Sequence, residues 1–351
     1  MLEQARAVLE GEEAWIVGGA VRDEALGRPV VDLDIACREP EKAARRFSKM
    51  ARGAPFPLSE RHGAWRVALD EARTVDFTPL HDGIEDDLAT RDFTINAVAR
   101  PLGGGEPADP FGGLADLERR VLRAVGPTIF RDDPLRLLRA VRLEDELGFR
   151  LDEETAELVR RDASLVDKPA GERILAELMR LTAAGYERLD ELGLLAPLGG
   201  SLERLRGLGK SSPEMRLVAV FGRGLQRLPV SNELRRYASA LVRAEPPGDL
   251  SARAVFRFRR ETEPWAIDAA RFAGGGADLE RAIERARAAD PAEPLLRGDE
   301  LGLPPGPEIG RLLARVEEER AAGTISTREE ALELVRREAA SGAPAPEVTD
   351  S

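Results

Sequence analysis

The sequence has little of what disulfide-stabilised, zinc-binding and membrane proteins depend on. One cysteine, Cys37, occurs in 351 residues, so an internal disulfide and a cysteine-based zinc site are excluded. Two histidines, His62 and His81, are too few for a histidine-rich metal site. Every apolar run is shorter than the roughly 20 residues of a membrane-spanning helix. Residues 1–15 also lack the basic start and apolar core of a secretory signal, so we expect a cytoplasmic protein without a membrane partner.

Charge is distributed unevenly along the chain. The formal net charge of −12 argues, taken alone, against a nucleic-acid partner. Residues 201–260, however, carry 13 Lys and Arg against 5 Asp and Glu, a local charge of +8 that leaves −20 for the rest. The segment ends in FRFRR, with Arg257, Arg259 and Arg260 beside aromatic residues. Two interpretations stay open: a solvated face of ordinary helices, or a surface that binds nucleic acid.

Secondary-structure patterns divide the chain into a mixed first third and a helical remainder, which predicts an α+β fold. Strands are predicted at residues 14–17, 30–37, 65–69, 74–78, 95–100 and 121–125. Residues 65–69 and 74–78 should form a hairpin. Helices are predicted at residues 1–10, 39–50, 133–147, 152–161, 172–181, 215–225, 233–243, 279–287, 309–321 and 328–337. Residues 341–351 contain too few apolar side chains to fold and are expected to be disordered.

A pair of carboxylates stands inside an apolar run, VDLDI, at residues 31–35. Residues two apart in a strand share a face and lie about 6 to 7 Å apart, so Asp32 and Asp34 project together while the three apolar residues enter the core. Converging carboxylates repel each other unless a cation lies between them, which predicts a divalent metal, and oxygen ligands suit Mg²⁺. Asp76, on the neighbouring strand, is the candidate third carboxylate of a two-metal site. The alternative is a solvated strand edge.

A glycine pair precedes the carboxylates in GGAVRD, residues 18–23. Gly18 and Gly19, at the end of a strand, let backbone N–H groups approach phosphates closely, and Arg22 can pair with phosphate oxygens bidentately. A tight turn without any ligand is the alternative. Together with the carboxylates, these residues predict a triphosphate bound beside metal ions.

Five sequence blocks follow one another in a fixed order over the first half of the chain. They are GGAVRDEALGRPVVDLDIA at 18–36, RDFTINAVA at 91–99, DPFGG at 109–113, DDPLRLLRAVR at 132–142 and ERILAEL at 172–178. In these blocks the chain resembles the class II tRNA nucleotidyltransferase and bacterial poly(A) polymerase family. LRGDELGLPPGPEIGRLL at 296–313 resembles the C-terminal segment of that family.

The resemblance implies a polymerase-β-like catalytic head with a small mixed sheet, followed by all-α parts. The head would span residues 1–125. A neck that recognises the nucleotide base would span 126–195, and a body and a tail that bind tRNA would span 196–275 and 276–340.

The resemblance also implies roles for individual residues. Asp32 and Asp34 would bind the metals, and Gly18, Gly19 and Arg22 the triphosphate. These roles imply an RNA 3′-hydroxyl that attacks the α-phosphate in line, with pyrophosphate as the leaving group.

Two further blocks would contact the rest of the nucleotide. Asp92 is similar to the ribose-reading residue of the family, and Arg91 and Asn96 belong to the same block; the alternative is a helix start that Asp92 caps. Asp133 and Arg136, at i and i+3 on one helical face, would present acceptors and donors to the base, with Arg139 in support. An ordinary surface ion pair is the alternative for that pair.

The segment after Leu80 bears on the subtype. Only HDGI stands between Leu80 and the EDDLATRDFT stretch, where family members that complete the CCA end carry a longer flexible loop. Thr90 replaces the first Arg of the usual Arg-Arg-Asp. We therefore predict a CC-adding enzyme that uses CTP on the tRNA 3′ end, with a separate A-adding enzyme acting on the same tRNA. Full CCA addition with ATP, a poly(A) polymerase and an RNA-binding pseudoenzyme remain alternatives. The basic segment around Arg257, Arg259 and Arg260 is then expected to bind RNA.

Overall fold

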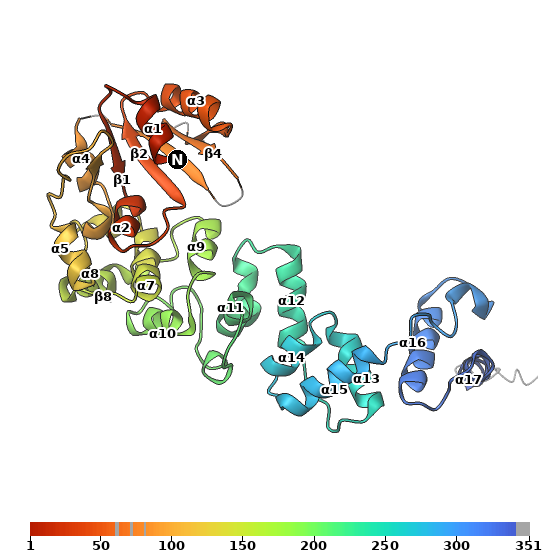
Figure 1. Cartoon of the computed structure of the whole chain (residues 1–351). Helices are drawn as coiled ribbons and strands as arrows, with labels where there is room; N and C mark the ends of the chain where they lie inside the picture. The colour runs from red at the N-terminus through yellow and green to blue at the C-terminus, as the bar shows by residue number, and fades with distance from the viewer. Residues whose placement is uncertain (60–62, 71–72, 81, 342–351) are drawn as a thin grey trace, which may run out of the picture. The chain divides into compact units, whose positions relative to one another are not determined.

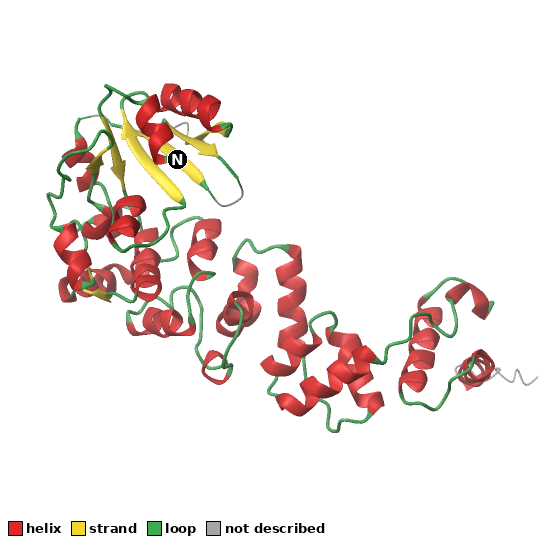
Figure 2. Cartoon of the chain, in the orientation of Figure 1, coloured by secondary structure: helices red, strands yellow, loops and turns green. Residues whose placement is uncertain are grey.

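The computed structural model describes residues 1–59, 63–70, 73–80 and 82–341 (Figure 1). The chain divides into two units, Met1–Leu202 and Glu203–Ser351. All strands of the described residues lie in the first unit, and the second contains helices and loops (Figure 2). The predicted α+β class is therefore confirmed. The finer division into four parts, with boundaries after residues 125, 195, 275 and 340, stays a prediction.

A six-stranded mixed sheet forms the centre of the first unit, in the order β3-β4-β5-β2-β1-β6. Its strands are β1 (Ala14–Val17), β2 (Asp32–Cys37), β3 (Ala54–Ser59), β4 (Ala64–Ala68), β5 (Thr74–Pro79) and β6 (Arg100–Pro101). β2 and β5 run parallel, and every other neighbouring pair runs antiparallel. The predicted hairpin of residues 65–69 and 74–78 is present as β4 and β5.

Helix α3 (Pro40–Ala51) covers one face of this sheet (Figure 1), and the other face carries Asp32 and Asp34 beside a smaller apolar cluster that includes Val17 and Ala36. Phe47 of α3 packs on Phe77 of β5, with ring centroids 5.7 Å apart. Leu33 and Ile35 are buried in the same core, as the alternation of VDLDI predicts. The expectation that Val31 also enters the core is wrong. This residue is 47% exposed because β2 begins only at Asp32.

Three strand predictions need correction. No strand was predicted at the position of β3; the structure places β3 at the edge of the sheet, where its prolines Pro55 and Pro57 are tolerated. Residues 95–100 hold part of a 3₁₀ turn (Thr94–Asn96), and only Arg100 of that range belongs to a strand, β6. β7 (Val121–Leu122) pairs in parallel with β8 (Arg150–Leu151), so the part expected to be all-helical contains one short strand.

The other helices of the first unit support the sheet or pack beside it. They are α1 (Leu2–Val8), α2 (Gly19–Ala25), α4 (Ile84–Ala89), α5 (Gly113–Arg119), α6 (Ile129–Asp132), α7 (Leu135–Leu147), α8 (Glu153–Asp162), α9 (Gly171–Leu178) and α10 (Ala183–Glu191). α7 packs against α9 and α10. α8 starts as predicted, with the side chain of Asp152 accepting a hydrogen bond from the backbone N–H of Thr155.

The predicted helix of residues 133–147 begins later than expected. Asp133 has an extended backbone, with φ −142° and ψ 99°, and follows the end of α6. Pro134 explains this break, because a proline ring disfavours the helical conformation of the residue before it. Asp133 and Arg136 therefore do not share one helical face: Asp133 precedes α7, whereas Arg136 lies in its first turn.

The second unit consists of helices, three of which start at a serine cap. They are α11 (Pro213–Phe221), α12 (Asn232–Arg243), α13 (Ala252–Thr262), α14 (Ala266–Phe272), α15 (Gly276–Ala288), α16 (Pro307–Ala321) and α17 (Arg328–Ser341). The hydroxyls of Ser212, Ser231 and Ser251 each accept a hydrogen bond from the N–H three residues on. Among the described helices of the chain, none is both long and apolar enough to cross a membrane. The predicted disordered end lies outside the described residues, apart from Ser341 at the end of α17.

Candidate active site

One cavity in the first unit gathers most of the predicted site residues. Its volume is about 670 Å³, within the range of small-molecule sites. Eleven predicted residues line it: Gly18, Gly19, Arg22, Asp32, Asp34, Arg91, Asp92, Asn96, Asp133, Arg136 and Arg139. They come from β2, α2, α7 and the loops beside them, which are far apart in sequence. Asp76 is the predicted residue of this unit that does not line the cavity.

Asp32 and Asp34 lie on the same face of β2 and line the cavity together. Asp32 is exposed and accepts a hydrogen bond from Thr74 Oγ1 at 2.8 Å. Burial, and then the nearby carboxylates of Asp76 and Asp32, raise the pKa of Asp34 to about 6 against the opposing effect of Arg91. The two carboxylates thus form a concentration of negative charge that a cation would neutralise.

Asp76 stands directly beside Asp34 in the register of β2 and β5 but has another partner. Both of its carboxylate oxygens accept hydrogen bonds from the Arg66 guanidinium, each at 2.7 Å. Arg66 therefore already neutralises Asp76. Among the described residues, no cluster of three carboxylate, imidazole or thiol groups stands ready to hold a metal. Asp76 as a third metal ligand remains a prediction that this arrangement does not favour.

The donor set of the cavity fits a divalent cation. Mg²⁺ is commonly bound by one or two carboxylates together with water and substrate phosphates, so Asp32 and Asp34 are sufficient protein ligands. Seven arginines line the cavity: Arg22, Arg91, Arg136, Arg139, Arg142, Arg173 and Arg180. Seven carboxylates oppose them: Asp23, Asp32, Asp34, Asp87, Asp92, Asp133 and Glu146. With these charges balanced, a bound triphosphate would require an additional cation to offset its own charge.

The glycine pair keeps space open between the carboxylates and the arginines. Gly18 has φ +67°, a conformation that side chains disfavour, and a Cβ there would lie 3.0 Å from Asp34 Oδ2 and 3.4 Å from Arg91 Nη1. A Cβ on Gly19 would lie 3.3 Å from Arg22 Nη2. Glycine at both positions thus allows a ligand to approach the backbone between the Asp34 carboxylate and two guanidinium groups.

A chain of hydrogen bonds connects the glycine-rich block to α7. Arg22 Nη1 donates to Asn96 Oδ1 at 2.9 Å, and Asn96 Nδ2 donates to Asp92 Oδ1 at 2.9 Å. The other oxygen of Asp92 accepts from Nε and Nη2 of Arg139, at 2.8 and 2.6 Å. Four predicted residues, Arg22, Asn96, Asp92 and Arg139, are thereby fixed relative to one another, which holds this part of the cavity in one geometry.

Asp92 is the buried centre of that chain. Burial raises its pKa, but the charge of Arg139 and hydrogen bonds from Asn96, Arg139 and the Phe93 N–H outweigh this, so the pKa lies below its ordinary value. Asp92 is thus an ionised, fully partnered carboxylate. The alternative that it merely caps a helix is not supported, because Phe93 is the N-cap of the following 3₁₀ turn and no side-chain cap is present.

Asp133 and Arg136 face the same cavity but contact different partners. Asp133 accepts from both terminal nitrogens of Arg173, at 2.8 and 3.4 Å. Arg136 donates to the backbone carbonyls of Thr90, at 2.6 Å, and Arg91, at 3.4 Å. Thr90, where the family commonly has an arginine, lines the cavity and holds Arg136 through its carbonyl oxygen. The alternative interpretation, an ordinary ion pair between Asp133 and Arg136, is not found among the interactions of the described residues.

Several residues that line or support the cavity were not predicted individually as site residues. Asp87 accepts from Arg91 at 2.7 Å and holds it beside the glycines. Arg142 pairs with Glu146 at 2.7 Å and with Glu177 at 2.6 Å, and burial lowers its pKa despite these partners. A usable signal existed for Arg142, Arg173 and Glu177, which belong to two of the five family-like blocks. Partners so distant in sequence cannot be assigned from spacing.

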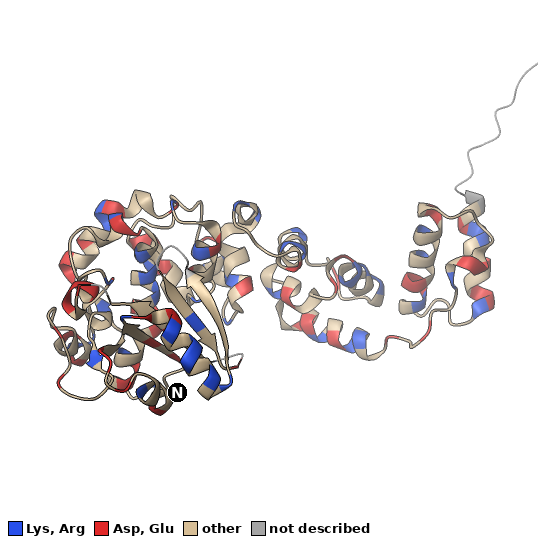
Figure 3. Cartoon of the chain, turned by 90° about the horizontal axis from the view of Figure 1, so that it is seen from above, with Lys and Arg blue, Asp and Glu red and all other residues tan. Residues whose placement is uncertain are grey.

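The three arginines predicted to bind RNA lie on α13 in the second unit. Arg257 pairs with Glu318 at 2.6 Å, and Arg259 pairs with Glu263 and Asp290. Arg260 is exposed and forms no ion pair with the described residues. Figure 3 shows cationic and anionic segments interspersed along the helices of this unit. RNA binding by these residues stays a prediction, with Arg260 the member whose charge is uncompensated.

Two known families match the first unit. The family described as "Poly A polymerase head domain" matches residues 14–81 and 65–123, which include the sheet and the carboxylate pair. The family described as "Probable RNA and SrmB- binding site of polymerase A" matches residues 148–202. The cavity is thus bordered by segments that match both descriptions.

Relatives that span nearly the whole chain carry three related names. An A-adding tRNA nucleotidyltransferase of Deinococcus radiodurans is 34% identical over 92% of this chain and 95% of the relative. A CC-adding tRNA nucleotidyltransferase of Thermus thermophilus is 32% identical over 91% of this chain and 92% of the relative. The crystal structure of the Bacillus stearothermophilus CCA-adding enzyme in complex with CTP is similar at 26% identity, with a TM-score of 0.76 over 97% of this chain and 98% of that chain.

Proposed function

The chain belongs to the family of tRNA nucleotidyltransferases and poly(A) polymerases, and from this premise we propose that it extends the 3′ end of tRNA with cytidine residues. It is a nucleotidyltransferase with a polymerase-β-like head and a mostly helical remainder. The observation that carries the proposal is the cavity in which a carboxylate pair, a glycine pair and seven arginines meet. Its proposed substrates are CTP and a tRNA that lacks part of its CCA end.

The proposed reaction joins the terminal 3′-oxygen of the RNA to the α-phosphorus of the nucleotide. The bond between that phosphorus and the bridging oxygen of the β-phosphate breaks, and pyrophosphate leaves. Because such reactions require little covalent chemistry from the protein, positioning and charge stabilisation supply most of the acceleration. The residues of the cavity are therefore assigned to binding and orientation.

Asp32 and Asp34 would hold a divalent cation, for which we propose Mg²⁺. When bound, this ion supplies electrostatic stabilisation of the negative charge on the triphosphate. The open space at Gly18 and Gly19 admits phosphate oxygens close to the backbone, and Arg22 contributes guanidinium donors. The hydrogen bonds from Asn96 to Asp92 and from Arg22 to Asn96 keep those donors aimed at one place.

Asp92, Asp133 and Arg136 are assigned to the nucleoside. Asp92 is ionised and offers acceptor oxygens to sugar hydroxyls, while Arg139 fixes its orientation. A cytosine edge carries one amino donor and two acceptors, which match the carboxylate of Asp133 and the guanidinium of Arg136. Both side chains are tethered, to Arg173 and to the Thr90 carbonyl, so the base would meet a preset pattern without a nucleic-acid template.

The CC-adding subtype rests on the short connection between β5 and α4. β5 ends at Pro79 and α4 begins at Ile84. Four residues leave no room for a long flexible loop that would reshape the base pocket from C to A; one of them, His81, lies outside the described residues. A-adding or full CCA activity is the alternative, favoured by the 34% identity to an A-adding relative.

One assay tests the proposal and its alternatives. The protein is incubated with Mg²⁺ and tRNA transcripts that end at the discriminator base or at CC, with CTP and ATP separately and together, and products are resolved on a sequencing gel. We expect two cytidines on the first transcript and no extension of the second, even with ATP. A terminal A on the CC transcript would contradict the subtype, and no extension of either transcript would contradict the proposed function.

A further inference from the structure

The sheet face that carries the carboxylate pair continues past the cavity to the free edge at β3. In the strand register, Asp34 of β2 lies beside Asp76 of β5. Arg66 of β4 lies beside Asp76, and Phe56 of β3 lies beside Arg66. Because residues directly opposite each other on neighbouring strands share a face, these four side chains form one row across the sheet. Phe56 ends this row, three strand spacings or about 14 Å from β2.

Phe56 is unusual among the aromatic residues of the chain. Its exposed fraction is 42%. Every other Phe, Tyr and Trp among the described residues is buried or half-buried. The next row of the same face consists of small residues: Thr74, Ala68 and Ala54. An open aromatic ring therefore stands on the same face as the proposed metal-binding carboxylates, with only small side chains on that side.

The geometry of phosphoryl transfer indicates which ligand passes over this row. Gly18 and Gly19 follow β1, and β1 and β5 lie on opposite sides of β2. In the proposed reaction, the phosphates that leave as pyrophosphate bind at these glycines. The attacking and leaving oxygens are roughly in line, so the attacking 3′-oxygen approaches the carboxylates from the side of β5. The RNA that carries this oxygen is then placed over β5, β4 and β3.

We propose that Phe56 stacks on an unpaired base at the 3′ end of the RNA, an inference that rests on the proposed function. Unpaired bases are commonly held by stacking on aromatic side chains. A phenyl ring has no hydrogen-bonding group, so it accepts any base. This tolerance suits an RNA whose terminal residue changes after each addition. The Arg66 guanidinium, fixed by Asp76, adjoins the ring and can extend the stacking surface.

The backbone of β3 disfavours a protein strand as the alternative occupant. Pro55 and Pro57 flank Phe56, and neither has a backbone N–H to donate to an added strand. The free edge of the sheet is therefore poorly suited to pairing with another chain. The exposed ring on the face of the sheet is unaffected by these prolines.

The test compares Phe56→Ala with Phe56→Tyr, which keeps an aromatic ring, and with Met50→Ala as the matched control. Met50 is 49% exposed and belongs to α3, which packs on the opposite face of the sheet. Nucleotide incorporation is measured over a series of concentrations of CTP and of a tRNA transcript lacking CCA. We expect Phe56→Ala to raise KM for the transcript about 10-fold, in keeping with the loss of one stacked base. KM for CTP in that variant, and both KM values in Phe56→Tyr and Met50→Ala, should stay within about twofold of the original.

A second measurement reports stacking without relying on catalysis. Two tRNA transcripts carry the fluorescent base 2-aminopurine as the terminal or the penultimate residue, and its emission depends on the groups that stack on it. At saturating protein, at least one transcript should give the same emission with the original protein, Phe56→Tyr and Met50→Ala, and a different emission with Phe56→Ala. Equal melting temperatures of the four proteins establish that folding is intact.

Three outcomes would overturn the inference. The first is an unchanged KM for the transcript and unchanged emission in Phe56→Ala. The second is an equal loss from Met50→Ala, which would indicate a general effect of exposed apolar surface. The third is a raised KM for CTP alone, which would place the free nucleotide over this row. Emission that depends on Phe56 in a protein that adds no nucleotide would refute the proposed function and retain this site, whereas normal CMP addition by Phe56→Ala would do the reverse.

Discussion

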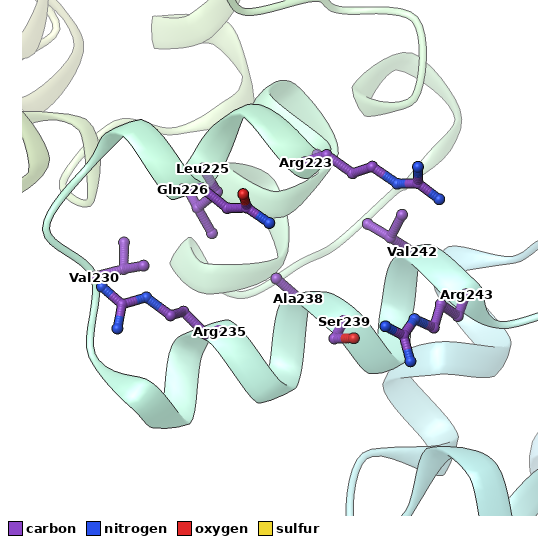
Figure 4. Close-up of a pocket in the computed structure, with 10 residues that line it drawn as sticks. Arg223, Leu225, Gln226, Val230, Arg235, Ala238, Ser239, Val242 and Arg243 are labelled. Carbon is purple, nitrogen blue, oxygen red and sulfur yellow. The ribbon is translucent and has the colours of Figure 1, made fainter.

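Each unit has a cavity lined by arginines, and the two cavities differ in what their arginines already hold. In the first unit, six of the seven lining arginines pair with carboxylates, and Arg136 donates to backbone carbonyls. In the second unit, a cavity of about 620 Å³ lies between η4 (Gly222–Arg227) and α12, and Figure 4 shows its three lining arginines: Arg223, Arg235 and Arg243. None of these three pairs with a carboxylate of the described residues. Similar side chains are therefore held differently in the two units. A paired guanidinium has a fixed direction, whereas an unpaired one has charge available for a ligand.

That difference follows the demands of the tasks predicted for the two units. A phosphoryl-transfer site requires groups held within fractions of an ångström, and ion pairs provide the necessary rigidity. Contact with a long polyanion depends on counterion release and tolerates mobile side chains. Substitutions in the first cavity should therefore reduce turnover, and substitutions of unpaired arginines in the second unit should reduce tRNA affinity and its salt dependence.

Among variants that keep the carboxylates of Asp32 and Asp34, the largest effect is expected when a buried pair of the first cavity is broken. Asp92→Asn keeps the shape of the side chain but leaves Arg139 without its counter-charge. CMP incorporation should fall about 100-fold because the sugar and phosphate donors lose alignment. The free energy of unfolding should fall by about 3 kcal/mol, as for other broken buried pairs. Single-turnover incorporation and urea denaturation measure the two effects.

Asp116→Asn is the matched control for that variant. Asp116 is as deeply buried, accepts from Thr94 and Arg123, and does not line the cavity. It should lower stability by a comparable amount and leave KM for CTP unchanged. Equal kinetic losses in both variants would mean that Asp92 acts only through stability.

A smaller effect is expected from closing the space beside the carboxylates. Gly18→Ala adds a methyl group 3.0 Å from Asp34 Oδ2, and incorporation should drop about 10- to 100-fold. Gly27→Ala is the control, because Gly27 has nearly the same φ, +66°, with no atom within 4 Å. Both should lose about 1 to 2 kcal/mol of stability from backbone strain. Full activity in Gly18→Ala would show that ligands do not approach there.

In the second unit, the paired arginines should matter for stability. Glu318 is buried and accepts from Arg257 and Arg315, with Arg253 nearby. Glu318→Gln should lower the free energy of unfolding by about 2 kcal/mol, measured by urea denaturation. Glu317→Gln, one residue away with a single contact at 3.9 Å, should change it by less than about 0.5 kcal/mol. Indistinguishable curves would remove the stabilising role from this cluster.

The smallest effect is expected on tRNA affinity when arginines of α13 are substituted, and it should differ between Arg260 and Arg257. Arg260→Gln should lower tRNA affinity about two- to threefold and reduce the salt slope by up to about 1 unit, because its charge is free. Arg257→Gln should change both quantities less, since Glu318 holds that guanidinium. A larger loss from Arg257 than from Arg260 would show that pairing within the chain does not prevent RNA contact.

Local patterns were sufficient to predict much of the fold and eleven of the residues that line the first-unit cavity. The alternation in VDLDI correctly places Leu33 and Ile35 in the core and the carboxylates on the opposite face. Helical spacing correctly finds α12 and α16 within a few residues. These features depend on residues that are close together in the sequence, so the local sequence pattern is sufficient to predict them.

Features that depend on distant partners were missed. The edge strand β3, which contains two prolines, was not predicted, because it is defined by its antiparallel pairing with β4. Asp76 lies beside Asp34 as expected, yet Arg66 on a third strand neutralises it. Asp133 was assigned to a helix because apolar spacing outweighed the local effect of Pro134. The periodicity of a sequence carries no information about contacts between residues that lie tens of positions apart. Such contacts determine which charged side chains are left without an ion-pair partner.

The most direct measurement of the central claim compares incorporation and binding in Asp34→Asn. This variant keeps the size of the side chain and removes one of the two proposed cation ligands. CMP incorporation into a tRNA transcript lacking CCA should fall by at least about 1,000-fold, while the dissociation constant for that transcript stays within about twofold of the original. Retained incorporation in Asp34→Asn would contradict the assignment of this cavity as the site of nucleotide transfer.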